Sequence, residues 1–540
     1  MHPIALHDLL KFQSEHRPEA LALLGADGAG LDYGSLAAHV ERLARGLLAL
    51  GLAPGERVAT WLPKRVDAVT ALFAISAAGG ALTPINPLLK PAQSGHILAD
   101  SGARVLITQR VRLESLREIL SLLHNLRWVI LVDESQGQAQ SEATDNAAPF
   151  PVHILSAREV ESMGEAARAL PALTEQDLAA LLYTSGSTGQ PKGVALTHRN
   201  LLAGAASVAD YLDIRPEDRV LAALPFSFDY GLSQLTVAFQ RGASVLPLDY
   251  LLPRDLHKAV TLHGISVLAG VPTLWQQLAT QDWLGELCSL RVLTNSGGRM
   301  PRPVIARLRA ALPQARLYLM YGLTEAFRST WLPPEELDRR PDSIGKAIPN
   351  AEVMVLRPDG TPCAPHEPGE LVHRGPTVAL GYWNDPERTA ERYRSIPHRM
   401  DGRPHPELAV WSGDRVRMDE EGFIYFIGRD DDMLKTSGYR ISPTEIEDVL
   451  YASGMVREAA AVGLEDEALG QRIIAVVTPE HADLDTQALL NHCRVNMPLY
   501  MTPHRIELRT TLPLTPNGKI DRRALRDELT AAASSSLEPV

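Results

Sequence analysis

The sequence predicts an α/β protein with a large N-terminal domain, built of layered α/β subdomains and a β-rich subdomain, and a small mobile α+β C-terminal domain. First, 540 residues exceed what one hydrophobic core usually supports. Second, short apolar runs alternate with helical periodicity over roughly the first 300 residues, a pattern typical of a sheet with crossover helices. Third, from about residue 350 short runs bounded by Gly, Pro and Asp replace that alternation.

Helical spacing and strand-like runs can be assigned in order along the chain. In the first part we expect helices at 5–13, 35–50, 66–78 and 94–100, and strands at 21–24, 57–62, 81–85 and 104–108. Further strands are expected at 219–224, 243–247, 264–269 and 290–294, and then at 352–356, 369–373 and 422–427. The last unit carries helices at 444–453 and 485–494 and strands at 458–462 and 473–477.

These elements divide the chain into two domains. We expect an N-terminal domain over 1–428 that binds ATP and substrate, a hinge at 429–431, a mobile C-terminal domain over 432–530 and a flexible tail at 531–540. The hinge falls in a charged stretch, and such a stretch is usually only a solvated face, but this one lies where the β-rich region gives way to the terminal unit. Ligands are expected where strands of the sheet end.

Composition excludes several classes of protein. The net charge is −12 and no Lys/Arg block stands out, so nucleic acid is not an expected partner. Cys288, Cys363 and Cys493 are far apart and lack metal spacing, which fits a reducing compartment and neither a disulfide frame nor a zinc site. No apolar run is long enough to span a bilayer and the N-terminus lacks the pattern of a signal peptide. We expect a cytoplasmic enzyme without membrane insertion; oligomeric state is open.

The stretch Tyr183-Thr-Ser-Gly-Ser-Thr-Gly-Gln-Pro-Lys-Gly193 predicts a phosphate-binding loop. It follows the apolar run 178–182, and its backbone N–H groups, its hydroxyls and the cation Lys192 suit an anion. A solvated Ser/Gly linker is the alternative, but linkers rarely lie between an apolar strand and a helix-like run such as 200–212. A Walker A loop is disfavoured, because Gly193 follows the lysine where that pattern needs Ser or Thr.

Four further motifs carry side chains suited to a nucleotide. Tyr321-Gly-Leu-Thr-Glu325 offers an aromatic ring, a hydroxyl and a carboxylate, and Asn295-Ser-Gly-Gly-Arg299 offers a turn suited to the edge of a base. Trp411-Ser-Gly-Asp414 ends an expected strand with a carboxylate that can accept ribose hydroxyls. Leu512-Pro-Leu-Thr-Pro-Asn-Gly-Lys-Ile-Asp521 puts Lys519 on a turn framed by Pro and Gly. Taken singly, Glu325 is as well explained by a solvated carboxylate in a strand-end turn, Asp414 by a buried Asp that satisfies a turn, and Lys519 by a surface lysine.

In this order, the motifs resemble those of the adenylate-forming superfamily of acyl-CoA synthetases, luciferases and peptide-synthetase adenylation domains, over essentially the whole chain. Ser76-Ala-Ala-Gly-Gly-Ala-Leu-Thr-Pro-Ile-Asn-Pro87 and Gly381-Tyr-Trp-Asn-Asp385 also match. The stretches 224–232 and 321–328 look most like AMP-forming acyl-CoA ligases associated with exosortase A systems. The resemblance implies that a carboxylate attacks Mg-ATP to give an acyl-adenylate and pyrophosphate, after which the small domain rotates and a thiol displaces AMP.

The resemblance also implies a role for each motif residue. Lys519 would be the adenylation catalyst, Thr324 would bind the α-phosphate, Glu325 would ligate Mg²⁺, and Asp431 would be the hinge. The other residues implied to bind ATP are Thr184, Ser185, Gly186, Ser187, Thr188, Gly189 and Lys192 at the β- and γ-phosphates, Gly297, Gly298, Arg299, Tyr321 and Gly322 around the adenine, and Asp414 and Arg429 at the ribose.

The substrate class is indicated by Ser227-Phe228-Asp229. Many fatty and aryl acyl-CoA ligases resemble Leu-Pro-Leu-Phe-His here, whereas amino-acid adenylating domains resemble Ser-Phe-Asp, whose Asp pairs with the substrate ammonium. A carboxylate lining an acyl pocket is costly unless a cation pairs with it, so an amino or imino acid is favoured. The alternative is an Asp that caps a helix near Gly231. By the same resemblance the substrate would also meet Phe228, Thr273, Ser296, Met320, Arg328 and Ser329, and Arg328 hints at a second anionic or polar group.

We therefore expect an ATP-dependent, Mg²⁺-dependent ligase that forms a thioester on coenzyme A or on the phosphopantetheine arm of a carrier protein; Phe228 would gate a pantetheine tunnel in either case. The alternatives are an acyl-CoA ligase for a fatty or aryl acid without an amine, and a non-catalytic nucleotide-binding protein on the same fold. An oxidative, luciferase-like use of the adenylate has no support in the sequence. Lys192, Glu325, Asp414 and Lys519 together speak against a mere binder.

Overall fold

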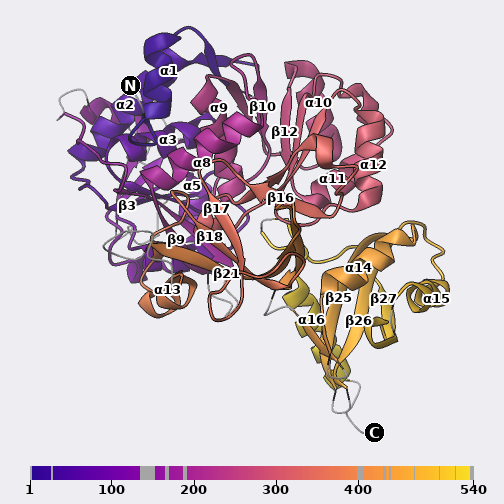
Figure 1. Cartoon of the computed structure of the whole chain (residues 1–540). Coiled ribbons are helices and arrows are strands. Elements are labelled where there is room, and N and C mark those ends of the chain that lie inside the picture. The colour runs from indigo at the N-terminus through magenta and orange to yellow at the C-terminus, as the bar shows by residue number, and fades with distance from the viewer. Residues whose placement is uncertain are drawn as a thin grey trace.

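The structure is a computed structural model of the chain (Figure 1). It describes residues 3–25, 28–133, 152–164, 169–185, 191–397, 407–429, 433–436, 439–466, 469–497, 499–516 and 518–535. Of Ser185 and Arg429 it describes the backbone only. Gly186, Ser187, Thr188, Gly189 and Asp431, to which the sequence assigns roles, lie outside the described residues.

The larger sheet joins a parallel half to an antiparallel half. Parallel pairing follows from the crossover helices between its first strands, and β14 then turns back into antiparallel partners. Within the described residues its order is β17-β18-β21-β22-β16-β15-β14-β13-β12-β10-β11-β1-β2, with β20 beside β21. The bounds are β1 Leu21–Leu24, β2 Gly30–Asp32, β10 Arg219–Ala222, β11 Ser244–Pro247, β12 Val267–Gly270, β13 Val292–Asn295, β14 Arg316–Tyr321, β15 Thr330–Leu332, β16 Ser343–Ala347, β17 Glu352–Leu356, β18 Gly369–Arg374, β20 Tyr393–Ser395, β21 Leu408–Met418 and β22 Ile424–Arg429.

A second sheet of the large domain carries the predicted phosphate loop. Its order among the described residues is β19-β9-β8-β4-β3-β5-β6-β7, and β8 pairs with β9 in an antiparallel hairpin. The bounds are β3 Arg57–Thr60, β4 Ala81–Pro84, β5 Val105–Thr108, β6 Trp128–Leu131, β7 His153–Ser156, β8 Leu178–Ser185, β9 Pro191–Thr197 and β19 Gly381–Tyr382.

Helices pack against both sheets and close the core between them. α3 and α9 are buried along nearly their whole length, which explains why α3 is apolar all round rather than on one face. One continuous hydrophobic cluster joins these helices to strands of both sheets. The bounds are α1 Asp8–His16, α2 Tyr33–Ala49, α3 Val66–Ala77, α4 Pro91–Ser101, α5 Arg110–Ser115, α7 Ala157–Met163, α8 His198–Tyr211, α9 Asp229–Arg241, α10 Pro253–His263, α11 Pro272–Ala279, α12 Arg302–Ala311 and α13 Pro386–Arg392.

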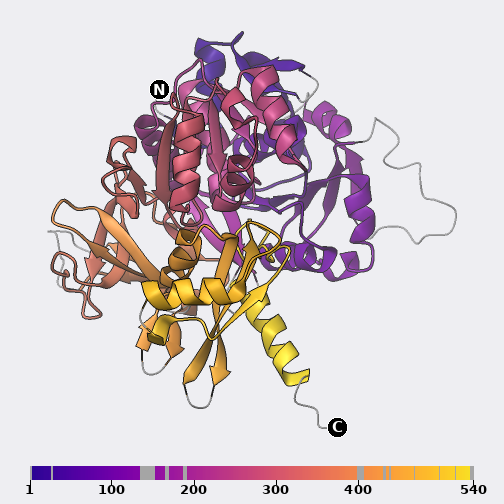
Figure 2. The ribbon, with the colours of Figure 1, turned by 90° about the vertical axis from the view of Figure 1, so that its right-hand side faces the viewer.

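The small C-terminal domain has a sheet and hydrophobic clusters of its own. Both views show it, in orange to yellow, as a separate lobe beneath the large domain (Figures 1 and 2). Its elements are β23 Leu434–Thr436, β24 Tyr439–Ile441, α14 Pro443–Ala452, β25 Val456–Asp466, β26 Gly470–Pro479, α15 Thr486–Asn496, β27 Arg505–Leu508 and α16 Arg522–Ser535. The mixed α/β fold with a large N-terminal and a smaller C-terminal domain is therefore confirmed.

Three local expectations were wrong. The loop expected after a strand at 178–182 is shorter, because β8 continues to Ser185 and pairs with β9 from Pro191, so Lys192 lies on a strand. Asp414 does not end a strand; it lies within β21, beside Gly413 at φ +71°, where the pairing register shifts. Residues 531–535 belong to α16 rather than to a tail.

The hinge at 429–431 stays a prediction. Among the described residues, no helix is both long and apolar enough to cross a membrane.

Candidate active site

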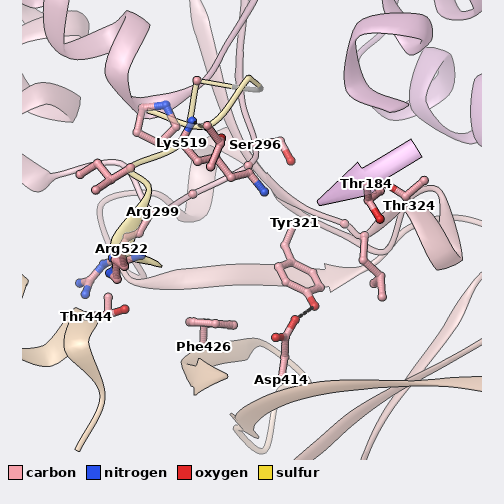
Figure 3. A pocket seen from close by; sticks show the side chains of 18 of the residues that line it. Thr184, Ser296, Arg299, Tyr321, Thr324, Asp414, Phe426, Thr444, Lys519 and Arg522 are labelled. Atoms are coloured by element: carbon pink, nitrogen blue, oxygen red, sulfur yellow. Dashed lines mark hydrogen bonds between the residues drawn. The ribbon is translucent and has the colours of Figure 1, made fainter. Parts of the chain in front are cut away.

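A cavity of 2040 Å³ lies between the two domains, at the ends of β12, β13 and β14. This is the edge of the sheet at which ligands of α/β proteins bind. Figure 3 shows side chains of both domains around it. Residues expected from the sequence that line it are Thr184, Lys192, Phe228, Asp229, Thr273, Ser296, Gly297, Gly298, Arg299, Met320, Tyr321, Gly322, Thr324, Glu325, Arg328, Asp414 and Lys519. Ser329 is not among the lining residues, although it follows Arg328.

One end of the cavity holds a lysine, a glutamate and a tyrosine in mutual contact. Nζ of Lys192 lies 3.2 Å from Oε1 of Glu325 and donates to the Tyr382 hydroxyl at 2.7 Å, and that hydroxyl donates to Glu325 at 2.7 Å. Burial alone would raise the pKa of Glu325, but the Lys192 charge and the Tyr382 hydrogen bond hold it below its usual value. Glu325 is therefore an ionised, partly buried carboxylate beside a cation.

The nearby strand β8 presents Thr184 to the same end of the cavity. Its Oγ1 is buried and has no hydrogen-bond partner among the described residues. An unsatisfied hydroxyl beside a lysine is suited to receive an anion. Thr324, in the short 3₁₀ turn Thr324–Ala326 before Phe327, is buried close by (Figure 3).

The middle of the cavity carries an aromatic platform. Tyr321, at the end of β14, lies parallel to His373 with ring centroids 6.2 Å apart, and Phe426 lies 6.3 Å away. The Tyr321 hydroxyl donates to the Asp414 carboxylate, as Figure 3 shows. Burial lowers the pKa of His373 to about 3, so this imidazole is neutral at pH 7. A flat neutral base could stack here with its sugar directed toward Asp414.

The glycine turn after β13 approaches the small domain closely. Gly297 has φ +84°, and a Cβ atom added there would lie 3.2 Å from Cε of Lys519. Gly298 accepts a hydrogen bond from Asn295 at 3.0 Å. Arg299 pairs with Asp342 of the large domain at 2.6 Å and also with Asp448 of the small domain. Arg299 thus links the two domains, a contact that the sequence did not predict.

The loop that carries Lys519 is docked onto the large domain. Thr273 donates from Oγ1 to the carbonyl oxygen of Gly518 at 2.9 Å, and Asn86 donates from Nδ2 to that of Pro516 at 3.0 Å. Nζ of Lys519 lies 6.0 Å from the centroid of the Phe228 ring. Lys519 therefore lies in the same cavity as Lys192 and Glu325, although more than 300 positions separate it from Lys192 in the sequence.

The other end of the cavity holds a buried ion pair. Asp229 is the first residue of α9, and Nη1 of Arg328 lies 3.4 Å from its Oδ2. Burial raises the pKa of Asp229, and the charges of Arg328 and Lys519 oppose that rise. Phe228 occupies the N-cap position of α9 and makes no side-chain capping bond, while Asp229 lies in the first turn and its carboxylate accepts a hydrogen bond from the Tyr230 N–H. The alternative of an Asp at the helix N-terminus therefore stays open beside the substrate role.

Sequence reasoning missed several functional neighbours. Tyr382 and Asn86 stand in motifs that the resemblance matched, but no role was assigned to them. Tyr230 stands in the matched stretch 224–232 but was given no role, and His373 carried no signal, because a buried ring in a strand or helix looks like ordinary core. The pairing of Asp229 with Arg328 could not be seen either, because 99 positions separate them.

The chain was compared with known proteins. Residues 10–383 match the family of AMP-binding enzymes, and residues 445–519 match the family of AMP-binding enzyme C-terminal domains. A long-chain-fatty-acid–CoA ligase of Salmonella typhimurium is 33% identical over 501 residues, covering 89% of this chain and 86% of that protein. An L-proline–[L-prolyl-carrier protein] ligase of Pseudomonas fluorescens is 32% identical over 531 residues, covering 96% and 98%.

Solved structures share the fold. The crystal structure of the anthranilate CoA ligase AuaEII in complex with anthranoyl-AMP aligns with a TM-score of 0.87 at 24% identity, covering 98% of this chain and 99% of that one. The two-domain arrangement described above is thus one that such ligases adopt.

Proposed function

The chain belongs to the AMP-binding enzymes, the adenylate-forming superfamily of AMP-forming acid–thiol ligases, and we propose that its substrate is a small polar acid, in the first instance an amino or imino acid, transferred to a pantetheine thiol. ATP is the co-substrate, and coenzyme A or a carrier-protein arm is the acceptor. The association with exosortase A systems stays a prediction.

In the first half-reaction a carboxylate oxygen of the substrate bonds to the α-phosphorus of ATP while the bond to pyrophosphate breaks. Two anions must approach, and charge grows on the oxygen between the α- and β-phosphorus. The ammonium of Lys519 is the group we assign to that charge, because a fixed cation in a site that excludes water stabilises it strongly. Lys192 and Thr184 would hold the phosphates, and Tyr321 and Asp414 the nucleoside.

The residues at the Lys192 end also fit a magnesium ion. Mg²⁺ is usually bound through one or two carboxylates together with substrate phosphates, and Glu325 is a partly buried carboxylate held ionised. A bound Mg²⁺ would neutralise charge on the phosphate oxygens. Glu325 would bind it, and Lys192 would then be released from Glu325 to the phosphates.

In the second half-reaction the thiol attacks the acyl carbon and AMP leaves. We propose that the small domain rotates about Asp431 for this step and withdraws Lys519 from the cavity. Such rearrangements of domains between chemical steps are common in enzymes. The observation that carries the whole proposal is that Lys519, from one domain, shares a cavity with Lys192 and Glu325, from the other.

An amine on the substrate would meet Asp229, which accounts for the amino-acid proposal. Arg328 already pairs with this carboxylate, so an ammonium group would share Asp229 with Arg328 rather than meet it alone. The second carboxylate oxygen has lone pairs for such sharing. A fatty or aryl acid has no group for either charge, and a buried pair facing an alkyl chain gains nothing from it. A non-catalytic nucleotide binder is the remaining alternative.

Pyrophosphate exchange into ATP tests this proposal. We expect exchange that depends on an added carboxylic acid and that is faster with amino or imino acids than with fatty or aryl acids of equal size. The assay measures radioactive pyrophosphate incorporated into ATP across a panel of free acids. Because exchange reports adenylate formation alone, the unknown thiol is not needed.

Two outcomes would contradict the proposal in different ways. No exchange with any acid would leave only nucleotide binding. Rapid exchange with simple fatty or aryl acids, and none with any amino or imino acid, would contradict the role proposed for Asp229. It would not contradict the proposed ligase function.

A further inference from the structure

The lining of the cavity near Lys519 includes a buried ion pair. Asp229 and Arg328 line the cavity and are 4% and 2% exposed. Behind them the Arg328 guanidinium lies over the Tyr230 ring, with Cζ 4.9 Å from its centroid, and 5.7 Å from that of Phe327. Tyr230 is held in turn by the hydroxyl of Thr294. This ion pair is therefore backed by packed rings.

The Arg328 guanidinium is only partly satisfied. Within the described part of the chain, its one hydrogen bond is the long contact of Nη1 with Asp229, at 3.4 Å. Nε and Nη2 are buried and have no hydrogen-bond partner among the described residues, and the same holds for Oγ of the adjacent Ser329. Buried donors of this kind are rare in native structures, and each one calls for an acceptor. Arg328 is among the residues that line the cavity, so a bound substrate lies next to this guanidinium.

The backbone next to Arg328 is strained. Phe327 has φ +50°, a conformation that a bulky residue rarely adopts, and its ring is packed against Gly204, where any Cβ atom would lie within 2.4 Å of it. Strain of this kind persists where the surroundings fix it, often at ligand sites. The fold therefore holds Arg328 in a set position against the end of the cavity.

From these contacts we infer that the substrate acid is short and carries a hydrogen-bond acceptor, a second carboxylate or a carbonyl oxygen, at the end remote from its reacting carboxyl group, and that Arg328 receives it. The inference rests on the proposed ligase function and narrows its substrate. The acceptor binds the unpaired N–H groups of the guanidinium. A methyl group in its place leaves them unpaired, so the site discriminates against it.

Matched acids that differ only in the remote group test this inference in pyrophosphate exchange. The pairs are glutamate or glutamine against norvaline, aspartate against 2-aminobutyrate, and glutarate against pentanoate. In at least one pair kcat/KM should be about 10- to 150-fold higher for the acid with the acceptor, the factor expected for a hydrogen bond to a charged group. Equal or faster exchange with the methyl-ended acids would overturn the inference and leave the ligase function standing.

A variant without the ion pair supplies the matched control. Arg328→Met alone would leave Asp229 buried and unpaired, so the variant to use is Asp229→Asn combined with Arg328→Met. Its KM for ATP should equal that of the wild type, which shows that the site has folded, and the preference for the acceptor should fall to within about twofold. A preference that persists in the double variant would assign recognition to another residue.

A second observation carries a separate inference about how Lys519 is positioned. The two contacts that dock its loop come from the large domain, and both donors are buried there: Asn86 is 5% exposed and Thr273 is 9% exposed. Asn86 is itself fixed, since its Oδ1 accepts from the Leu88 N–H at 2.9 Å. Two rigid donors thus meet two carbonyl oxygens that flank the turn before Lys519.

We infer that Asn86 and Thr273 are positioning residues for adenylation, which hold the loop so that Lys519 reaches the cavity. Thr273, expected from the sequence to face the substrate, makes its hydrogen bond to this loop instead. The inference rests on the use of Lys519 in the first half-reaction only. Once the small domain has rotated, the two donors no longer meet the loop, and the second half-reaction does not need them.

Asn86→Asp and Thr273→Val test the positioning role. The aspartate still accepts from the Leu88 N–H, but an oxygen replaces the amide nitrogen that donates to the Pro516 carbonyl oxygen. Valine has nearly the shape of threonine but lacks the hydroxyl. Each change should slow single-turnover adenylate formation by about 2- to 13-fold, the range for one neutral hydrogen bond, and both together by more. Thioester formation from a prepared adenylate should be unchanged.

Thr273→Ser is the control, because it keeps the hydroxyl and should behave like the wild type. Equal slowing of both half-reactions in the double variant would indicate general damage and overturn the inference, as would an unchanged adenylation rate. A raised KM for the acid in Thr273→Val, with an unchanged maximal rate, would indicate that Thr273 binds the substrate, as expected from the sequence.

Discussion

Lys519→Ala should lower the rate of acyl-adenylate formation by about 10²- to 10³-fold, the cost of removing one preorganised charge-stabilising group from an active site. The ammonium lies in the cavity with Lys192 and Glu325, near Gly297 and the Phe228 ring. Without it, the charge that grows between the α- and β-phosphorus loses the cation that we assign to it. ATP binding should be little affected, because the groups proposed to hold the phosphates and the base belong to the large domain.

The two half-reactions separate this role from a structural one. Adenylate formation is followed by pyrophosphate exchange or by single-turnover release of pyrophosphate, and transfer is followed from a chemically prepared acyl-adenylate to the thiol. We expect only the first to fall. If both fell by the same factor, the assignment of Lys519 to one domain arrangement would be wrong.

Glu325→Gln should lower adenylate formation by about 10²-fold and raise the Mg²⁺ concentration at which exchange is half-maximal. The glutamine side chain has nearly the same shape but no charge. It therefore gives up the carboxylate that we assign to the metal, and it also leaves the Lys192 ammonium without its 3.2 Å partner. The measurement is a titration of pyrophosphate exchange with Mg²⁺ at saturating ATP and acid.

Tyr382→Phe is the matched control for that change. It removes the hydroxyl that bonds both Lys192 and Glu325 but leaves both charges in place. Its Mg²⁺ requirement should stay near that of the wild type. An unchanged Mg²⁺ requirement in Glu325→Gln, or an equal shift in both variants, would mean that Glu325 acts on Lys192 rather than on the metal.

Much of the fold could be predicted from the sequence because its signals are local. Apolar runs located the strands around 219–224, 243–247, 264–269 and 290–294 to within a few residues, since their burial on both faces dictates composition. The start of the loop before Lys192 was placed too early. Tyr183 and Thr184 favour a strand, but the Gly, Ser and Thr residues that follow them in the sequence led to a predicted strand end at residue 182.

The sequence predicted those residues of the candidate site that stand in a motif with recognisable chemistry. Lys192, Tyr321, Glu325, Asp414 and Lys519 do line one cavity. What the sequence could not supply is which side chains pair across the fold. Asn86 and Pro516 are 430 positions apart, and whether Asp229 meets a substrate or an arginine depends on where the turn after β14 directs Arg328.

The contact of Lys192 with Glu325 and Tyr382 affects which anions can bind at this end of the cavity. A lone phosphate ion would have to draw the ammonium away and leave the buried carboxylate beside a second negative charge, at a net loss. A polyphosphate that arrives with its own divalent cation offers a new partner to each group at once. We therefore expect this end of the cavity to bind the metal–nucleotide complex in preference to small inorganic anions.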